Sequence, residues 1–260
     1  MTLALIAGAG DLPVALLDRL PARPLVCALE EAEPHVPVDL WFRLERLGGF
    51  LRDLRARGVT QVCMAGGIQR PGIAWRHFDW PTVRLLPVML RALSKGDDGA
   101  LRTFIAVLEN HGLRVVAAHD IVPGLLPAAG VLTVTQPGPP HRSDALVGDR
   151  CLHDMGRRDS GQACIVRDGR IVDEEDRRGT DALIGRNPGR GGILFKGPKP
   201  DQDRRADLPV IGPGTARGVI AAGLDGIVIE AGGVMVLDRD AVIATLDATQ
   251  KFLWVREVTR

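Results

Sequence analysis

A stretch near the N-terminus decides the fold, and it runs Leu3-Ala4-Leu5-Ile6-Ala7-Gly8-Ala9-Gly10-Asp11-Leu12-Pro13. Its five consecutive apolar residues, 3–7, predict a strand buried on both faces, as in a parallel sheet. The glycines allow a tight turn, and Pro13 is well tolerated at the start of a helix. This order opens many nucleotide-binding α/β domains, although a plain strand-to-helix turn has the same pattern. The candidate contacts for a substrate phosphate are Gly8, Gly10, Asp11 and Leu12.

The alternation of apolar runs and helical patterns continues to about residue 120. Further buried strands are predicted at residues 24–29, 61–65 and 114–118. Helices are predicted at residues 13–20, 50–57, 82–93 and 98–111. Strands that alternate with helices indicate a doubly wound sheet, so residues 1–130 are predicted to form a Rossmann-like N-terminal domain.

The pattern changes in the second half of the chain. Residues 124–142 are rich in proline and glycine and are predicted to be a linker. Asp168-Gly169 between two apolar runs predicts a type I′ hairpin. Strands at 163–166, 171–173, 192–196, 226–230, 234–237 and 252–255 and helices at 214–222 and 240–249 complete the pattern. Residues 131–260 are therefore predicted to form a second, mixed α/β domain.

Composition excludes several classes of protein. The 260 residues carry a formal net charge of +1, which argues against a broad nucleic-acid surface. We find no apolar stretch of the length that a membrane helix needs and no signal peptide at the N-terminus, so we expect a cytoplasmic protein. The cysteines Cys27, Cys63, Cys151 and Cys164 form no CxxC pair and indicate no zinc site; Cys27 and Cys63 are expected to be buried thiols.

A second glycine turn follows the predicted strand at 61–65. Its residues Gly66 and Gly67 should lie near the Gly8 turn, because ligands bind outside the carboxyl ends of strands in open α/β sheets. Arg70 then either grips a phosphate or is a solvated loop residue. Asp97 and Asp98 either cap the next helix or hold Mg²⁺; we favour capping for one of the pair.

The most informative run extends from Lys196 to Pro209 and alternates cations with carboxylates. Such a loop either supports phosphoryl chemistry, where cations offset charge and carboxylates hold Mg²⁺ or activate water, or is a solvated surface loop. Polar residues at predicted strand ends or turns add candidates. These are Gln162, Thr180, Asp181 and Glu230, the last of which ends an apolar strand.

The main alternative to an enzyme of phosphoryl chemistry is an NAD(P)-binding oxidoreductase. Gly8, Gly10 and Glu30 fit a dinucleotide fingerprint. Pro13 replaces its third glycine, however, and the second half offers no recognisable hydride-transfer site. A non-catalytic nucleotide-sugar binding protein is the other alternative.

The motifs together resemble the LpxI family, the UDP-2,3-diacylglucosamine pyrophosphatases of lipid A biosynthesis. The resemblance covers nearly the whole chain. Its motifs are residues 6–13, 67–71, 96–98, 161–162, 179–181, 199–200, 202–203, 205, 207–209, 211–213, 215 and 230–233. The stretch from Lys199 to Thr215 is the most specific, whereas the Gly8 turn alone is common.

The resemblance implies a Mg²⁺-dependent hydrolase that yields 2,3-diacylglucosamine 1-phosphate and UMP. It also implies a homodimer that works peripherally at the inner face of the cytoplasmic membrane. Residues 131–260 would then be the catalytic domain, with the active site in the cleft between the two domains. Expected catalytic residues are Asp203, Asp207, Lys199 and Arg205, with Asp203 and Asp98 as metal ligands. Expected substrate contacts are Gly8, Gly10, Asp11, Leu12, Gly66, Gly67, Arg70, Gln162, Thr180, Asp181, Thr215 and Glu230.

Aromatic side chains near arginines suit a lipid–water interface, although a core or dimer contact fits them equally. They are Trp41, Phe42, Trp75, Phe78 and Trp80.

Overall fold

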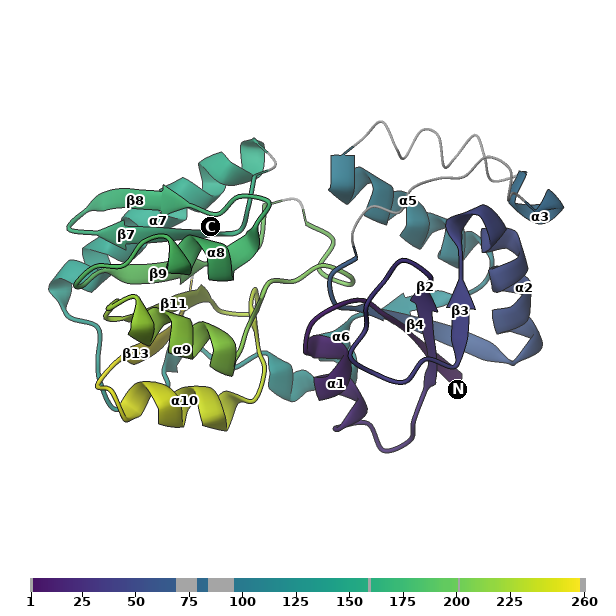
Figure 1. The fold of residues 1–260 in the computed structure, drawn as a ribbon, viewed down its shortest axis with the longest axis horizontal. Coiled ribbons are helices and arrows are strands. Elements are labelled where there is room, and N and C mark those ends of the chain that lie inside the picture. The colour runs from purple at the N-terminus through teal and green to yellow at the C-terminus, as the bar shows by residue number, and fades with distance from the viewer. Residues whose placement is uncertain (1, 69–78, 84–95, 159, 201, 258–260) are drawn as a thin grey trace. The chain divides into compact units, whose positions relative to one another are not determined.

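The computed structural model describes residues 2–68, 79–83, 96–158, 160–200 and 202–257, and the chain divides into two compact units (Figure 1). One unit comprises residues 1–123 together with 203–207, and the other comprises residues 124–202 and 208–260. Each unit has its own sheet and its own apolar core. The fold is therefore a two-domain α/β fold, as predicted.

The N-terminal unit is built on a parallel sheet with the strand order β3-β2-β1-β4-β5. Its strands are β1 (Thr2–Ala7), β2 (Leu25–Leu29), β3 (Leu40–Phe42), β4 (Val59–Ala65) and β5 (Arg114–Val116). Its helices are α1 (Leu12–Leu17), η1 (Leu44–Arg46), α2 (Leu47–Ala56), α3 (Trp80–Val83), α5 (Gly96–Asn110) and α6 (Ala118–Ile121). This is the strand order of a Rossmann half, with the order reversing between β1 and β4.

The C-terminal unit is built on a mixed sheet with the order β6-β13-β11-β9-β7-β8. Strands β9 (Ile193–Lys196), β11 (Gly226–Glu230) and β13 (Phe252–Arg256) are parallel. Strands β6 (Gly130–Val131), β7 (Ala163–Arg167) and β8 (Arg170–Glu174) pair in antiparallel fashion. Beside this sheet, β10 (Val210–Ile211) pairs with β12 (Met235–Val236).

Helices cover both faces of this sheet. On one face, α8 (Gly179–Gly185), α9 (Pro213–Ala221) and α10 (Arg239–Asp247) cover a core that includes Leu194, Ile227 and Leu253. On the other face, α7 (Pro139–Arg157) packs Leu152 and Met155 against Phe195 and Val228. Successive residues of a strand point to opposite faces, so the apolar residues of β9 and β11 serve both cores.

The predicted hairpin is confirmed. Asp168 and Gly169 have φ of 50° and 73° between the paired residues Arg167 and Arg170, and a type I′ turn needs two positive φ angles. Gly169 also donates its N–H to the buried Asp144 of α7 over 2.6 Å, which ties the turn to the helix.

Four local predictions were wrong. The proposed linker at 124–142 contains the turn η3 (Pro123–Leu125), β6 and the start of α7, because proline fits the first turn of a helix. Thr180 and Asp181 lie in the first turn of α8 rather than at a strand end or in a turn between elements. Strand β5 ends at Val116, and α6 begins at Ala118. Asp97 and Asp98 lie inside the first turn of α5 instead of preceding it.

In the part of the chain that the structure describes, we find no helix with both the length and the apolar character needed to span a bilayer.

Candidate active site

The two glycine turns of the N-terminal unit lie side by side at the carboxyl ends of β1 and β4. Ala9 donates its N–H to the Gly67 carbonyl over 2.8 Å, and Gly67 donates back to the Ala9 carbonyl over 2.9 Å. Gly8 donates to the Ala65 carbonyl over 2.8 Å. The expected neighbourhood of the two turns is thus confirmed, at the point where the strand order reverses and open α/β sheets bind ligands.

Glycine is required here by close backbone approach. A Cβ on Gly8 would lie 2.5 Å from the Gly67 carbonyl oxygen. A Cβ on Gly66, whose φ is +91°, would lie 2.6 Å from the Ala9 carbonyl oxygen. Larger residues would push the two turns apart, so the sequence motif has a structural cause that is independent of any ligand.

The residues after the Gly8 turn have different exposures. Asp11 precedes α1 with a side chain that is 82% exposed, and one carboxylate oxygen lies 3.7 Å from Nδ1 of His35. Leu12 is buried in the core and offers a ligand only its backbone. Arg70 lies outside the described residues, and so does the side chain of Asp98, although the backbone of Asp98 belongs to α5.

A buried cation stands at the carboxyl edge of the C-terminal sheet. Lys196 ends β9, is only 8% exposed, and donates from Nζ to Oγ1 of Thr180 over 2.7 Å and to the Val210 carbonyl over 3.0 Å. Burial lowers the pKa of the Lys196 ammonium, while the carboxylates of Glu175 and Asp181 act in the opposite direction. The neighbouring carboxylates therefore partly offset the cost of burying this charge.

The same hydrogen-bond network positions Gln162, another predicted substrate contact. Thr180 donates from Oγ1 to Oε1 of Glu175 over 2.5 Å, and Oε2 of Glu175 accepts the backbone N–H of Gln162, also over 2.5 Å. Within the described residues, Oε1 of Gln162 is buried and has no hydrogen-bond partner. A buried acceptor without a partner is costly unless a ligand donor or water satisfies it, so this edge is a candidate ligand contact.

Glu175 was missed as a site residue, and Lys196 was named only as the first cation of the charged run, with no role of its own. For Lys196 the sequence does hold the signal that singled out Glu230, a charged residue at the end of an apolar strand. Glu230 ends β11, next to β9, where its neighbour Ile229 pairs with Lys196. Glu175 lies just beyond β8, and only the antiparallel pairing of β7 and β8 brings it beside Gln162.

Thr215 and Lys199 flank this edge. Thr215 is buried in the first turn of α9, where its Oγ1 accepts the Gly212 N–H over 3.4 Å. The backbone N–H of Lys199 donates to Oε1 of the buried Gln202 over 3.0 Å. Both residues therefore lie in backbone held by local hydrogen bonds.

Residues 203–207, part of the charged run from Lys196 to Pro209, belong to the N-terminal unit. There Ala206 packs against the N-terminal core. Arg205 donates from Nε to Oδ1 of Asp203 over 3.0 Å and from Nη2 to Oδ2 over 2.8 Å. Its Nη1 donates to Oε1 of Glu109 in α5 over 2.6 Å. The predicted catalytic residues Asp203 and Arg205 thus form one bidentate pair anchored to α5.

This pairing sets the charge of Asp203. Hydrogen bonds from Arg205 hold the pKa of the Asp203 carboxyl below its ordinary value against the opposing effect of burial. A carboxylate of this kind is ionised at neutral pH and is a weak base, which suits charge stabilisation or the orientation of water better than proton abstraction.

Magnesium was expected at Asp203 and Asp98. Across the described residues, no group of three or more His, Cys, Asp and Glu side chains could hold a metal ion. Both oxygens of Asp203 already accept from Arg205. The described donors therefore do not fit a preformed metal centre.

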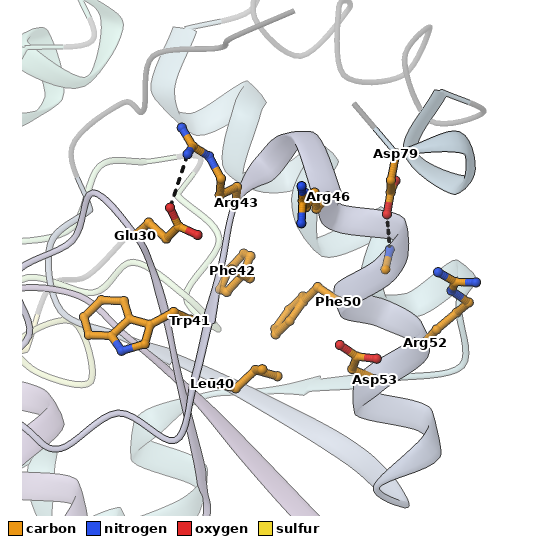
Figure 2. Close-up of a pocket in the computed structure, with 11 residues that line it drawn as sticks. Glu30, Leu40, Trp41, Phe42, Arg43, Arg46, Phe50, Arg52, Asp53 and Asp79 are labelled. Atoms are coloured by element: carbon orange, nitrogen blue, oxygen red, sulfur yellow. Dashed lines mark hydrogen bonds and ion pairs between the residues drawn. The ribbon is translucent and has the colours of Figure 1, made fainter. Parts of the chain in front are cut away.

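The N-terminal unit also holds a cavity of about 410 Å³ beside β3 and α2 (Figure 2). Trp41 at its rim is 48% exposed, whereas Phe42 is buried and stacks on Phe50 with ring centroids 3.9 Å apart. Arg43 pairs with Glu30 over 3.3 Å (Figure 2). Phe42 is thus a core residue, Trp80 is 74% exposed in α3, and Trp75 and Phe78 lie outside the described residues.

The thiols of the N-terminal sheet are buried in its core and are poorly suited to nucleophilic catalysis. Cys27 and Cys63 are free and buried, as predicted, and burial raises the pKa of each to about 12. Covalent catalysis needs a thiolate, which neither residue forms at neutral pH.

Together these features define a two-domain α/β protein with paired glycine turns at a topological switch point and a cation–carboxylate loop, an arrangement suited to a phosphorylated ligand. Comparison with known proteins specifies the class further. The model of the LpxI N-terminal domain matches residues 2–125, and that of the LpxI C-terminal domain matches residues 128–254. The chain belongs to the LpxI family. It is 35% identical over 264 residues to the UDP-2,3-diacylglucosamine pyrophosphatase LpxI of Caulobacter vibrioides, covering 94% of both chains.

Proposed function

We propose that this protein hydrolyses the pyrophosphate bond of UDP-2,3-diacylglucosamine, giving 2,3-diacylglucosamine 1-phosphate and UMP for lipid A biosynthesis. The observation that carries the proposal is the match to the Caulobacter pyrophosphatase along 94% of both chains. The cations and carboxylates of the loop from Lys199 to Asp207 supply the charges that this reaction needs.

In the proposed reaction, water attacks a phosphorus atom of the pyrophosphate and the phosphoanhydride bond breaks. The ionised Asp203 accepts a hydrogen bond from the attacking water and orients it. Lys199 and Arg205 offset the negative charge that develops on the phosphoryl oxygens, with Asp207 as a further carboxylate of the same loop. The glycine turns and Gln162, Thr180, Asp181, Thr215 and Glu230 bind the rest of the nucleotide sugar.

We further propose that Mg²⁺ enters with the substrate. Mg²⁺ keeps several waters and is commonly held by one or two carboxylates together with substrate phosphates. Such an ion needs only one or two protein carboxylates, so it does not require a group of three or more ligands among the described residues. When bound, the ion would neutralise pyrophosphate charge, with Asp203 as the first protein ligand to test and Asp98 as the second.

Two proposals concern the surroundings of the enzyme. A diacylated substrate resides in a membrane, so we propose peripheral attachment of this cytoplasmic enzyme to the inner face, with exposed Trp41 and Trp80 as candidate contacts. We also propose a homodimer. The location of the active site between the two domains stays a prediction.

The experiment is product analysis. Purified protein is incubated with UDP-2,3-diacylglucosamine in detergent with Mg²⁺, and both products are quantified by liquid chromatography and mass spectrometry. Equal amounts of UMP and 2,3-diacylglucosamine 1-phosphate support the proposal. Binding without product would indicate a non-catalytic nucleotide-sugar protein, and thermal stabilisation by NADH but not by UMP with Mg²⁺ would favour the oxidoreductase alternative.

A further inference from the structure

A cavity of about 310 Å³ lies in the C-terminal unit, on the α7 face of the sheet. Its walls include the apolar residues Leu152, Phe195, Pro198 and Pro200. Its lining also includes the polar residues Asp149, Glu230 and the exposed His153. An apolar hollow with a few polar groups is the usual form of a small-molecule site.

The cavity shares a strand end with the buried-lysine network. Phe195 belongs to the core beneath α7, whereas the next residue, Lys196, contacts Thr180 of α8 on the opposite face. Alternation along β9 therefore places an apolar wall on one side of the sheet and a buried cation on the other. The two features lie at the same carboxyl edge.

Two glycines allow the prolines of the cavity wall to pack closely against the backbone. A Cβ on Gly156 of α7 would lie 2.4 Å from Cδ of Pro200, and one on Gly233 would lie 2.7 Å from Cδ of Pro198. The two prolines therefore pack directly on backbone, and their rings have no rotatable side-chain torsion. The cavity is preformed by rigid groups, which lowers the entropic cost of binding.

The cavity is continuous with residues of the proposed active site. Glu230, a predicted substrate contact, lines it. Pro198 and Pro200 stand on either side of Lys199, a predicted catalytic cation. A ligand held by its phosphates at this loop can thus extend an apolar portion into the cavity.

We propose that this cavity is an acyl-chain subsite, which takes the hydrocarbon of one fatty acyl chain of the substrate. This inference rests on the proposed function, whose substrate is acylated. It adds where the chain binds and which residues determine the preference for chain length. Each methylene buried there adds about fourfold to affinity, until the chain fills the cavity.

The test uses n-alkyl phosphates from C6 to C12, below their micelle concentrations, as probes that combine an anion with a single chain. Affinity is measured by calorimetry for the full-length protein and three variants. Leu152→Phe fills the cavity, and His153→Trp covers its margin from an exposed position. Leu146→Phe is the matched control, because Leu146 is a 52% exposed leucine on the same helix.

We expect wild-type affinity to rise at least ~10-fold from C6 to C12. Leu152→Phe and His153→Trp should remove most of this gain while leaving C6 binding within about twofold, and Leu146→Phe should match wild type. Should one cavity variant fail to fold, the other decides the outcome. A chain-length gain that both retain, or an equal loss for every probe, would overturn the subsite.

The same variants separate the subsite from the function. Chain-length-dependent binding that the cavity variants abolish, without UMP release from any acylated UDP-glucosamine, would retain the subsite and reject the proposed function. UMP release whose KM is unaffected by Leu152→Phe would retain the function and reject the subsite.

Discussion

Nζ of Lys196 lies 2.7 Å from Oγ1 of Thr180, and the same hydroxyl donates to Glu175. A cation buried at the end of β9 thereby holds the first turn of α8 against the backbone of Gln162. This chain of contacts positions two predicted substrate contacts and makes the strand edge rigid.

Lys196→Met should lower the free energy of unfolding by about 3–5 kcal/mol, because it removes the donor to the Thr180 hydroxyl and the Val210 carbonyl and leaves the nearby carboxylates of Glu175 and Asp181 without their cation. Urea denaturation of the purified protein measures the change. Lys251→Met is the matched control, since the Nζ of Lys251 lies 3.7 Å from Asp225 in a looser pair and should cost less than about 1 kcal/mol. Equal losses in the two variants would contradict the assigned role of Lys196.

Gly66→Ala should destabilise the N-terminal unit by about 2–4 kcal/mol, because the new methyl group meets the Ala9 carbonyl at a positive φ. Gly67→Ala is the control for stability, since a Cβ there would meet nothing within 4 Å. Thermal and urea unfolding of the two variants are compared. Similar midpoints would show that the turns do not require the close approach.

Asp173 should make the free energy of unfolding depend on pH. Hydrogen bonds from Arg186 (2.6 Å) and Asn187 (2.7 Å) lower the pKa of its carboxyl. Because the folded pKa is depressed, the stabilisation is present above the unfolded pKa of about 3.9 and is lost as the pH falls through the folded value.

Asp173→Asn should therefore cost about 1–2 kcal/mol at pH 7, and the difference from wild type should shrink as the pH falls below about 3.9. Urea midpoints at pH 7, 5, 4 and 3 measure it. Asp154→Asn serves as control, because that carboxylate is 69% exposed and lies 3.8 Å from Nδ1 of His153. A constant difference between Asp173→Asn and wild type across this range would refute the linkage.

The sequence predicts the N-terminal fold well because strand, turn and helix signals there are local. Residues 3–7 form a strand, and the Gly8 turn lies where the Rossmann order requires it. Local residue preferences led to wrong or missing predictions of secondary structure at three places. Pro139 and Pro140 resemble a loop but begin α7. The short β3 has too few residues to show periodicity, and the glycine of Gly179-Thr180-Asp181 suggests a turn although α8 begins there.

The candidate site residues could be named from the sequence, but their contacts could not. Gln162 directly precedes β7 and Glu230 ends β11, so both are visible in the sequence as polar residues beside apolar runs, whereas Thr180 lies in the first turn of α8. The pairing of Arg205 with Glu109 joins residues 96 positions apart, and no local pattern encodes it. The bidentate Asp203–Arg205 pair likewise depends on the conformation of its loop.

The central claim is that Asp203 serves the hydrolysis of a UDP-linked diacylglucosamine. Its most direct test is the rate of UMP release from UDP-2,3-diacylglucosamine by wild type, Asp203→Asn and Glu109→Gln, with Mg²⁺ or with EDTA. Glu109→Gln weakens only the exposed end of the Arg205 pair and should stay within about threefold of wild type. We predict metal-dependent release by wild type and a loss of at least ~100-fold in kcat for a folded Asp203→Asn. Near-normal release by Asp203→Asn, or no release by wild type with any divalent metal, would contradict the account.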